Sequence, residues 1–211
     1  LFDKAKDVEY IGESSTSYLH SSSAYLNIKN ISPKAKIIII LRNPINRSIS
    51  HYYNDYREGS EKRSLDIALF EDYKSTFKGF GINHMYIDNS LYYESIEKYI
   101  ITFGIDNVKI LIFEKMITDM DYLNNELTNF LNLSFDNIDL KNKNKLKLPR
   151  NQIFKFLLQQ AYLKNFVKNI FPQIFKNLLR KKIIFTSNVN KKKLQKASYV
   201  KLNNIFKDDF M

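Results

Sequence analysis

The sequence predicts an α/β fold, in which helices flank a parallel sheet, with a basic helical C-terminal part. The short apolar run Ile37–Leu41 shows no alternation, which is typical of a strand buried on both faces, and the run 107–113 (NVKILIF) predicts a second buried strand. A helical pattern follows each run, and strand–helix–strand–helix order is typical of a parallel sheet. A composition of 44% hydrophobic and 26% charged residues is that of a globular protein.

The first predicted helix follows Ile37–Leu41 with no loop between them. Asn43 can cap this helix, and Pro44 fits its first turn, where a missing N–H costs nothing. Gly59 can end it. Its apolar face, at helical spacing, consists of Ile45, Ile49, Tyr52, Tyr53 and Tyr56.

Further helices are predicted along the chain. One begins at Ser64 and ends at Tyr73, and another begins at Asp88 or Asn89 and stops at Gly104. The pattern in 121–131 predicts a helix whose inward residues are Leu123, Leu127, Phe130 and Leu131. A last helix is predicted within 190–210, and a basic helical stretch within 151–182, interrupted at Pro172.

The distribution of charge divides the chain into two parts, which we expect to belong to one domain. The first part is the α/β core in 1–140, and the second is a basic helical part in 141–211. A polar linker, 141–150, opens the second part. The first part holds 15 Lys and Arg against 20 Asp and Glu, and the second holds 18 against 2. This asymmetry indicates an anionic partner, which could be a nucleic acid, a membrane surface, or a phosphorylated or sulfated molecule. A solvated basic face explains it equally well.

Several classes of site and location are disfavoured. The chain has no Cys, so disulfides and thiolate chemistry are excluded, and its three His are scattered without the spacing of metal ligands. No apolar run approaches the roughly 20 residues of a membrane span. We expect no metal and a bacterial cytoplasmic location. The chain begins with Leu1 rather than Met, which leaves a preceding signal or anchor open.

Arg42 lies at the carboxyl end of a predicted strand, where open α/β sheets bind ligands. The helix that begins at Pro44 offers free N–H groups and a positive dipole there. Asn46, Arg47 and Ser50 are spaced to lie on the helix side away from the aromatic residues. An arginine fork beside a helical hydroxyl suits phosphate. The alternative is an Arg paired with an acidic neighbour and a Ser tolerated within a helix.

The stretch LRNPINRSISHYY, 41–53, resembles the 3′-phosphate-binding element of the sulfotransferases that use 3′-phosphoadenosine 5′-phosphosulfate (PAPS). The match lies at Arg42, Asn43, Pro44, Arg47, Ser50 and Tyr52. It implies that Arg42 and Ser50, with Arg47 in the same motif, bind the 3′-phosphate of PAPS. Ser48 stands where Ala is usual, a small change.

The resemblance extends over about residues 10–135, and is greatest to the bacterial and glycan-modifying, heparan-sulfate-sulfotransferase-like branch. The matching segments are YIGESSTSYLH (10–20), SLYYESIEKYI (90–100) and VKILIFEKM (108–116). It implies a fold similar to P-loop nucleotide kinases and transfer of a sulfuryl group from PAPS to a hydroxyl or amine, on a carbohydrate. It further implies that Glu13 is the catalytic base and that Tyr92 lines the acceptor cleft.

The sequence departs from the family in places. No Lys-x-Gly-Thr-Thr loop, which binds the 5′-phosphosulfate, is present, so we expect a fragment that is inactive by itself. Ser14 and Ser95 stand where relatives carry other substrate-contacting residues. Two alternatives stay open. One is another phosphotransferase of related fold, although no Walker motif is present. The other is a non-enzymatic basic adaptor that binds a membrane or a nucleic acid. Under the sulfotransferase hypothesis, by contrast, we expect no nucleic acid partner.

Overall fold

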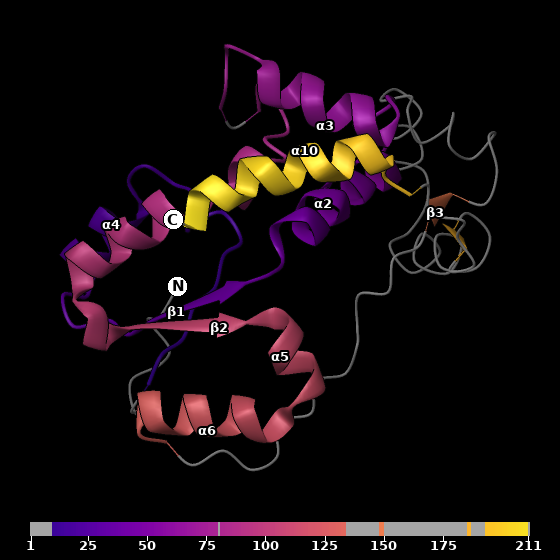
Figure 1. Cartoon of the computed structure of the whole chain (residues 1–211). Helices are drawn as coiled ribbons and strands as arrows, with labels where there is room; N and C mark the ends of the chain where they lie inside the picture. The colour runs from indigo at the N-terminus through magenta and orange to yellow at the C-terminus, as the bar shows by residue number, and fades with distance from the viewer. Residues whose placement is uncertain (1–9, 80, 134–147, 150–184, 187–192, 211) are drawn as a thin grey trace, which may run out of the picture. The chain divides into compact units, whose positions relative to one another are not determined.

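The computed structural model describes residues 10–79, 81–133, 148–149, 185–186 and 193–210. Strands β1 (Ile37–Leu41) and β2 (Val108–Ile112) pair in a two-stranded sheet and run in the same direction (Figure 1). Helices separate the two strands along the chain. The predicted α/β class with a parallel sheet is therefore confirmed.

The helices make up most of the described structure. The α-helices are α1 (Ala24–Ile31), α2 (Pro44–Glu58), α3 (Leu65–Lys74), α4 (Tyr93–Phe103), α5 (Phe113–Thr118), α6 (Met120–Leu131) and α10 (Lys196–Lys207). Short 3₁₀ turns are η1 (Asp88–Ser90), η2 (Ile105–Asn107) and η4 (Asp208–Phe210). A short antiparallel pair joins β3 (Leu148–Pro149) to β4 (Phe185–Thr186), with Leu148 opposite Thr186.

Helix α2 begins and ends as the sequence predicts. The side chain of Asn43 accepts a hydrogen bond from the N–H of Asn46 at 3.1 Å, and Pro44 occupies the first turn. Gly59 ends the helix with a φ of 79°, a conformation that glycine adopts without steric cost. Gly104 ends α4 with a φ of 83°. These local signals mark both ends of α2 and the C-terminal end of α4.

The chain forms two compact units, of which the first contains residues 1–39 and 93–110. Here α1 packs against α4 through aromatic rings. Tyr25 meets Tyr99 edge-on at 6.0 Å, and Tyr99 stacks on Phe103 at 6.1 Å. The hydroxyl of Tyr99 donates to the carbonyl of Tyr18 at 2.9 Å, which ties the segment before α1 to α4.

The second unit contains residues 40–92 and 111–211. Its main core lies between α2, α3, α10 and the segment that precedes η1, and α10 runs beside α2 in Figure 1. The buried residues of this core are Ile45, Tyr52, Tyr53, Leu65, Ala68, Leu69, Tyr86, Ile87, Leu202 and Phe206. A smaller cluster of Leu111, Met116 and Leu123 joins the end of β2 to α5 and α6.

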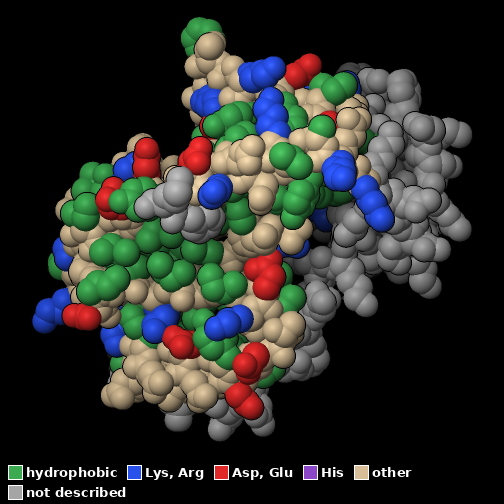
Figure 2. Space-filling model, in the orientation of Figure 1, with side chains coloured by type: hydrophobic (Ala, Val, Ile, Leu, Met, Phe, Trp, Pro, Cys, Tyr) green, Lys and Arg blue, Asp and Glu red, His purple; other side chains and the backbone are tan. Residues whose placement is uncertain are grey.

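The expected burial of both strand faces is wrong. Ile39 and Leu41 are buried, but Ile38 is 38% exposed and Ile40 is 52% exposed. Successive strand residues point to opposite faces, so the described helices cover only one face of β1. Hydrophobic side chains reach the surface in the space-filling view (Figure 2), and Ile112 at the end of β2 is also among the exposed ones.

The helix expected to begin at Asp88 or Asn89 begins instead at Tyr93. Asp88–Ser90 form the separate turn η1, and Leu91 after it is extended, with a φ of −87° and a ψ of 116°. The buried Ser90 hydroxyl donates to the carbonyl of Tyr86 at 3.0 Å, which anchors this turn. A buried side-chain contact thus outweighs the local preference for one continuous helix.

The remaining expectations concern the C-terminal part. The last helix is confirmed as α10, which η4 follows. The linker in 141–150, apart from β3, and the basic helices expected within 151–182 lie outside the described residues. The division into 1–140 and 141–211 stays a prediction.

Candidate functional site

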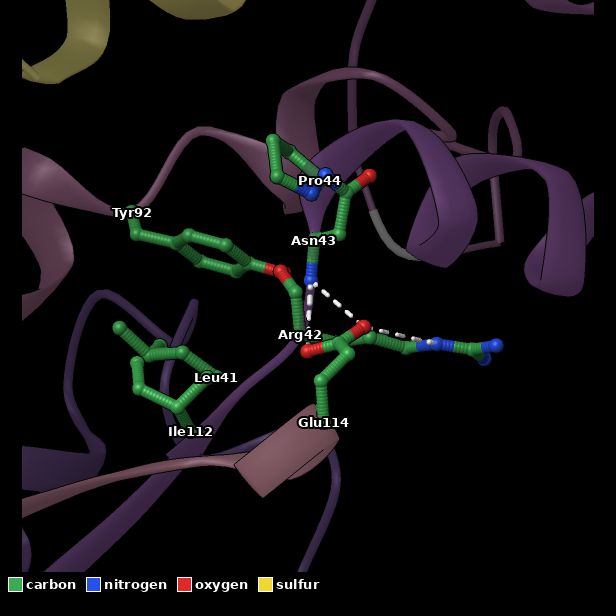
Figure 3. Close-up of a pocket in the computed structure, with 7 residues that line it drawn as sticks. All are labelled: Leu41, Arg42, Asn43, Pro44, Tyr92, Ile112 and Glu114. Carbon is green, nitrogen blue, oxygen red and sulfur yellow. Dashed lines mark hydrogen bonds and ion pairs between the residues drawn. The ribbon is translucent and has the colours of Figure 1, made fainter. Parts of the chain in front are cut away.

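The turn between β1 and α2 contains the residues that the sequence proposes for anion binding. A cavity of about 340 Å³ opens at this turn (Figure 3). Its lining consists of Leu41, Arg42, Asn43, Pro44, Tyr92, Ile112 and Glu114. Four of these residues come from the end of β1 and the start of α2, and two follow one another closely at the end of β2.

Arg42 is held on one side of its guanidinium. Its Nε lies 3.9 Å from the Glu114 carboxylate, and its guanidinium carbon lies 5.3 Å from the centre of the Phe113 ring. The Nε atom is buried and makes no hydrogen bond within the described part of the chain. These contacts involve the Nε edge and one face of the guanidinium. The whole side chain is 38% exposed, so the two terminal nitrogens can bind an anion from solvent.

Glu114 contacts the backbone of the turn as well as Arg42. The N–H of Asn43 donates to both carboxylate oxygens of Glu114, at 3.2 and 3.3 Å. Sequence reasoning did not propose Glu114 as a site residue. A signal was present, because Glu114 lies two residues after the end of β2 and Arg42 lies directly after β1, and the carboxyl ends of parallel strands share one edge.

Tyr92 is buried and points its hydroxyl at the turn. The hydroxyl donates to the carbonyl of Arg42 at 3.1 Å (Figure 3 shows the ring beside Arg42). The N–H of Tyr92 donates to Asp209 Oδ2 at 2.6 Å, a contact across 117 positions that sequence reasoning could not anticipate. Burial raises the pKa of Tyr92, although the charge of Arg47 opposes this, so the phenol is a neutral donor.

Arg47 and Ser50 lie in different surroundings. The Arg47 Nη1 atom contacts the carbonyl of Tyr86 and the hydroxyl of Ser90, both at 3.4 Å, and burial lowers its pKa. Ser50 is exposed, about two turns along α2 from Asn43. The structure therefore directs Arg47 toward the interior, and does not bring it to the side of α2 that Ser50 occupies.

Ser48, which the sequence marked only as a small departure from the family, is fully buried. Its hydroxyl lies 2.9 Å from the carbonyls of Pro44 and Tyr86, and 2.8 Å from the hydroxyl of Ser90. An alanine could not make these contacts. Ser48 and Arg47 together join α2 to the segment 86–90.

Glu13 belongs to the other compact unit and is exposed. Its Oε1 accepts a hydrogen bond from the hydroxyl of Tyr18 at 2.8 Å. This hydrogen bond is the main reason that the pKa of Tyr18 is raised. Glu13 thus has a carboxylate that a solvent-borne hydroxyl can reach, with one oxygen already oriented by a tyrosine.

Among the described residues no group of His, Asp and Glu could hold a metal ion. The helices of the described segments include none that is both long and apolar enough to cross a lipid bilayer.

A family model and a solved structure that resemble the chain both belong to sulfotransferases. The family model described as "Sulfotransferase domain" matches residues 7–209. The crystal structure of a sulfotransferase from Alicyclobacillus acidocaldarius is similar, with a TM-score of 0.55 and 25% sequence identity. That match covers 74% of this chain and 64% of the other, so the chain spans less than two thirds of that protein. No curated protein matches the chain significantly.

Proposed function

Since the chain belongs to the sulfotransferase domain family, we propose that it serves in the transfer of a sulfuryl group from PAPS to a hydroxyl or amine of a carbohydrate acceptor. The fold supports this, because the α/β class and the likeness to a bacterial sulfotransferase agree. The single observation that carries the donor assignment is the position of Arg42 at a strand end, beside the start of α2 and in the cavity.

The donor would be bound largely through its phosphates. The terminal nitrogens of Arg42 would form paired hydrogen bonds to the 3′-phosphate, and the exposed hydroxyl of Ser50 would donate a further one. Arg47 adds positive charge near the start of α2 and anchors the helix. Its contacts with Tyr86 and Ser90 favour an indirect contribution over a direct phosphate contact.

In the reaction, the bond between sulfur and the bridging oxygen of the donor breaks, and a bond forms between sulfur and the acceptor oxygen or nitrogen. Adenosine 3′,5′-bisphosphate leaves, and the acceptor proton moves to a base. Glu13 is the proposed base, because its exposed carboxylate is oriented by Tyr18. As in phosphoryl transfer, positioning and charge stabilisation contribute most of the rate acceleration.

A binding comparison tests the donor assignment. Calorimetric titration of the chain with adenosine 3′,5′-bisphosphate and with adenosine 5′-monophosphate isolates the contribution of the 3′-phosphate. Charge-assisted hydrogen bonds of about 1.5–3 kcal/mol predict that the bisphosphate binds at least about tenfold more tightly. Equal affinity for the two nucleotides would contradict the proposal and favour the alternative of a basic adaptor, for which single-stranded DNA and anionic vesicles are the comparison ligands.

A further inference from the structure

The peptide group between Arg42 and Asn43 is held at both of its polar ends. Its carbonyl, which belongs to Arg42, accepts the hydroxyl of Tyr92 at 3.1 Å. Its N–H, which belongs to Asn43, donates to both oxygens of Glu114 at 3.2 and 3.3 Å. The two partners lie 50 and 71 positions away along the chain.

A peptide group is planar, so two contacts at opposite ends fix the rotation of the whole plane. That rotation sets the direction in which Arg42 leaves β1 and the direction in which Asn43 enters α2. Asn43 has a φ of −46° and a ψ of 122°, which is outside the helical region, and its side chain caps the helix from this position. One peptide plane therefore governs both the arginine and the helix start.

Both partners are themselves restrained. Tyr92 is only 4% exposed, and its own N–H is held by Asp209. Glu114 lies in the first turn of α5, just beyond β2, and its carboxylate also lies 3.9 Å from the Nε of Arg42. Their polar atoms are directed at the turn, so the hydroxyl of Tyr92 is already used as a donor inside the protein.

We propose that Tyr92 and Glu114 are positioning residues of the anion site, which act through the peptide between Arg42 and Asn43. This inference rests on the proposed function, since it assigns them to the 3′-phosphate of the donor. It gives Tyr92 a role toward the donor instead of the acceptor role that the family resemblance implied. Loss of either contact leaves Arg42 present but misdirected.

Calorimetry on the 211-residue chain tests the inference with adenosine 3′,5′-bisphosphate and adenosine 5′-monophosphate as ligands. One lost hydrogen bond predicts that Tyr92→Phe weakens bisphosphate binding about three- to tenfold, and monophosphate binding by less than about twofold. Glu114→Ala should have a similar selective effect. Glu114→Gln should restore most of the affinity, because an amide oxygen still accepts from the Asn43 N–H.

The double variant Tyr92→Phe, Glu114→Ala reports on the shared peptide. If both residues act through one plane, the double variant loses little more than the stronger single variant, instead of the product of the two losses. Tyr93→Phe with Glu97→Gln is the matched control, because this pair has a hydroxyl–carboxylate hydrogen bond of 3.0 Å but does not line the cavity. The control should leave both affinities unchanged.

Three results would overturn the inference: an unchanged ratio of the two affinities in Tyr92→Phe, multiplicative losses in the double variant, or equal losses in Glu114→Gln and Glu114→Ala. In the natural protein, a Tyr92→Phe variant with a raised acceptor KM and a normal donor affinity would also overturn it and restore the acceptor role. If Tyr92→Phe does not fold, the two Glu114 variants decide. Arg42→Ala distinguishes failure of the proposed function from failure of this inference. If Arg42→Ala leaves the ratio of bisphosphate to monophosphate affinity unchanged, the proposed function fails. If Arg42→Ala lowers that ratio but Tyr92→Phe does not, only this inference is refuted.

Discussion

The hydroxyls of Ser48 and Ser90 lie 2.8 Å apart, although 42 positions separate the two residues in the chain. Both side chains are fully buried, and both hydroxyls also approach the carbonyl of Tyr86, at 2.9 and 3.0 Å. Buried hydroxyls need such partners, because an unpaired one is costly. These hydrogen bonds connect α2 to the segment that leads to Tyr92. Helix α2 begins at the candidate anion site.

Ser48→Ala should destabilise the protein. The variant removes one hydroxyl from this network and leaves the carbonyl of Tyr86 with fewer donors, which predicts a loss of about 1–2 kcal/mol in the free energy of unfolding. Urea denaturation followed by circular dichroism measures it. Ser50→Ala, on the exposed side of the same helix, is the control and should stay within about 0.5 kcal/mol of the natural protein. A Ser48→Ala protein as stable as its parent would show that the network contributes nothing.

Glu61 should make stability depend on pH in the acid range. Burial would raise its pKa, but hydrogen bonds from the Arg63 side chain and from the N–H groups of Arg63 and Lys62 outweigh it and lower the pKa from 4.5 to about 2. The folded state therefore binds its proton less readily than the unfolded state. The resulting stabilisation is fully present above pH 4.5 and is lost as the pH falls toward 2.

Urea midpoints at pH 6, 4 and 3 test this dependence. Glu61→Gln should lower stability at pH 6 and should show a smaller loss between pH 6 and pH 3 than the natural protein. Glu71→Gln is the matched control, because Glu71 also pairs with Arg63, at 3.3 Å, but its side chain is 61% exposed. An unchanged acid slope in Glu61→Gln would mean that other groups produce the pH dependence.

Glu13→Gln should impair turnover in the natural protein. The glutamine keeps the size of the side chain and can still accept the hydrogen bond from Tyr18, but it cannot take a proton. The usual contribution of a general base predicts a fall in kcat of roughly 10²- to 10⁴-fold with donor affinity nearly unchanged. Radiolabelled sulfuryl transfer measures it, with Glu94→Gln on the same compact unit as the control. Near-normal turnover would assign the base to another residue.

Much of the fold could be predicted because local signals were strong. Asn43, Pro44 and Gly59 set the bounds of α2 through capping and backbone preferences that act within a few residues. Both strands were predictable because each coincides with a short apolar run, which is also a local feature of the sequence. By contrast, the exposure of Ile38 and Ile40 depends on what packs against the sheet, which the strand's own residues do not encode.

The candidate site was predictable only in part. Arg42 followed from its place at a strand end, but the roles of Tyr92 and Asp209 depend on contacts across 50 and 117 positions. Arg47 was expected beside Ser50 from helical spacing alone. Its long side chain instead reaches the buried polar atoms of Tyr86 and Ser90, where spacing gives no guidance.

The central claim is that Arg42 binds the 3′-phosphate of the donor, and calorimetry of Arg42→Ala tests it most directly. Loss of a paired, charge-assisted contact predicts that adenosine 3′,5′-bisphosphate binds about 10- to 100-fold more weakly, while adenosine 5′-monophosphate loses less than about threefold. The selective loss would place the 3′-phosphate at Arg42. An equal loss for both nucleotides would contradict the account.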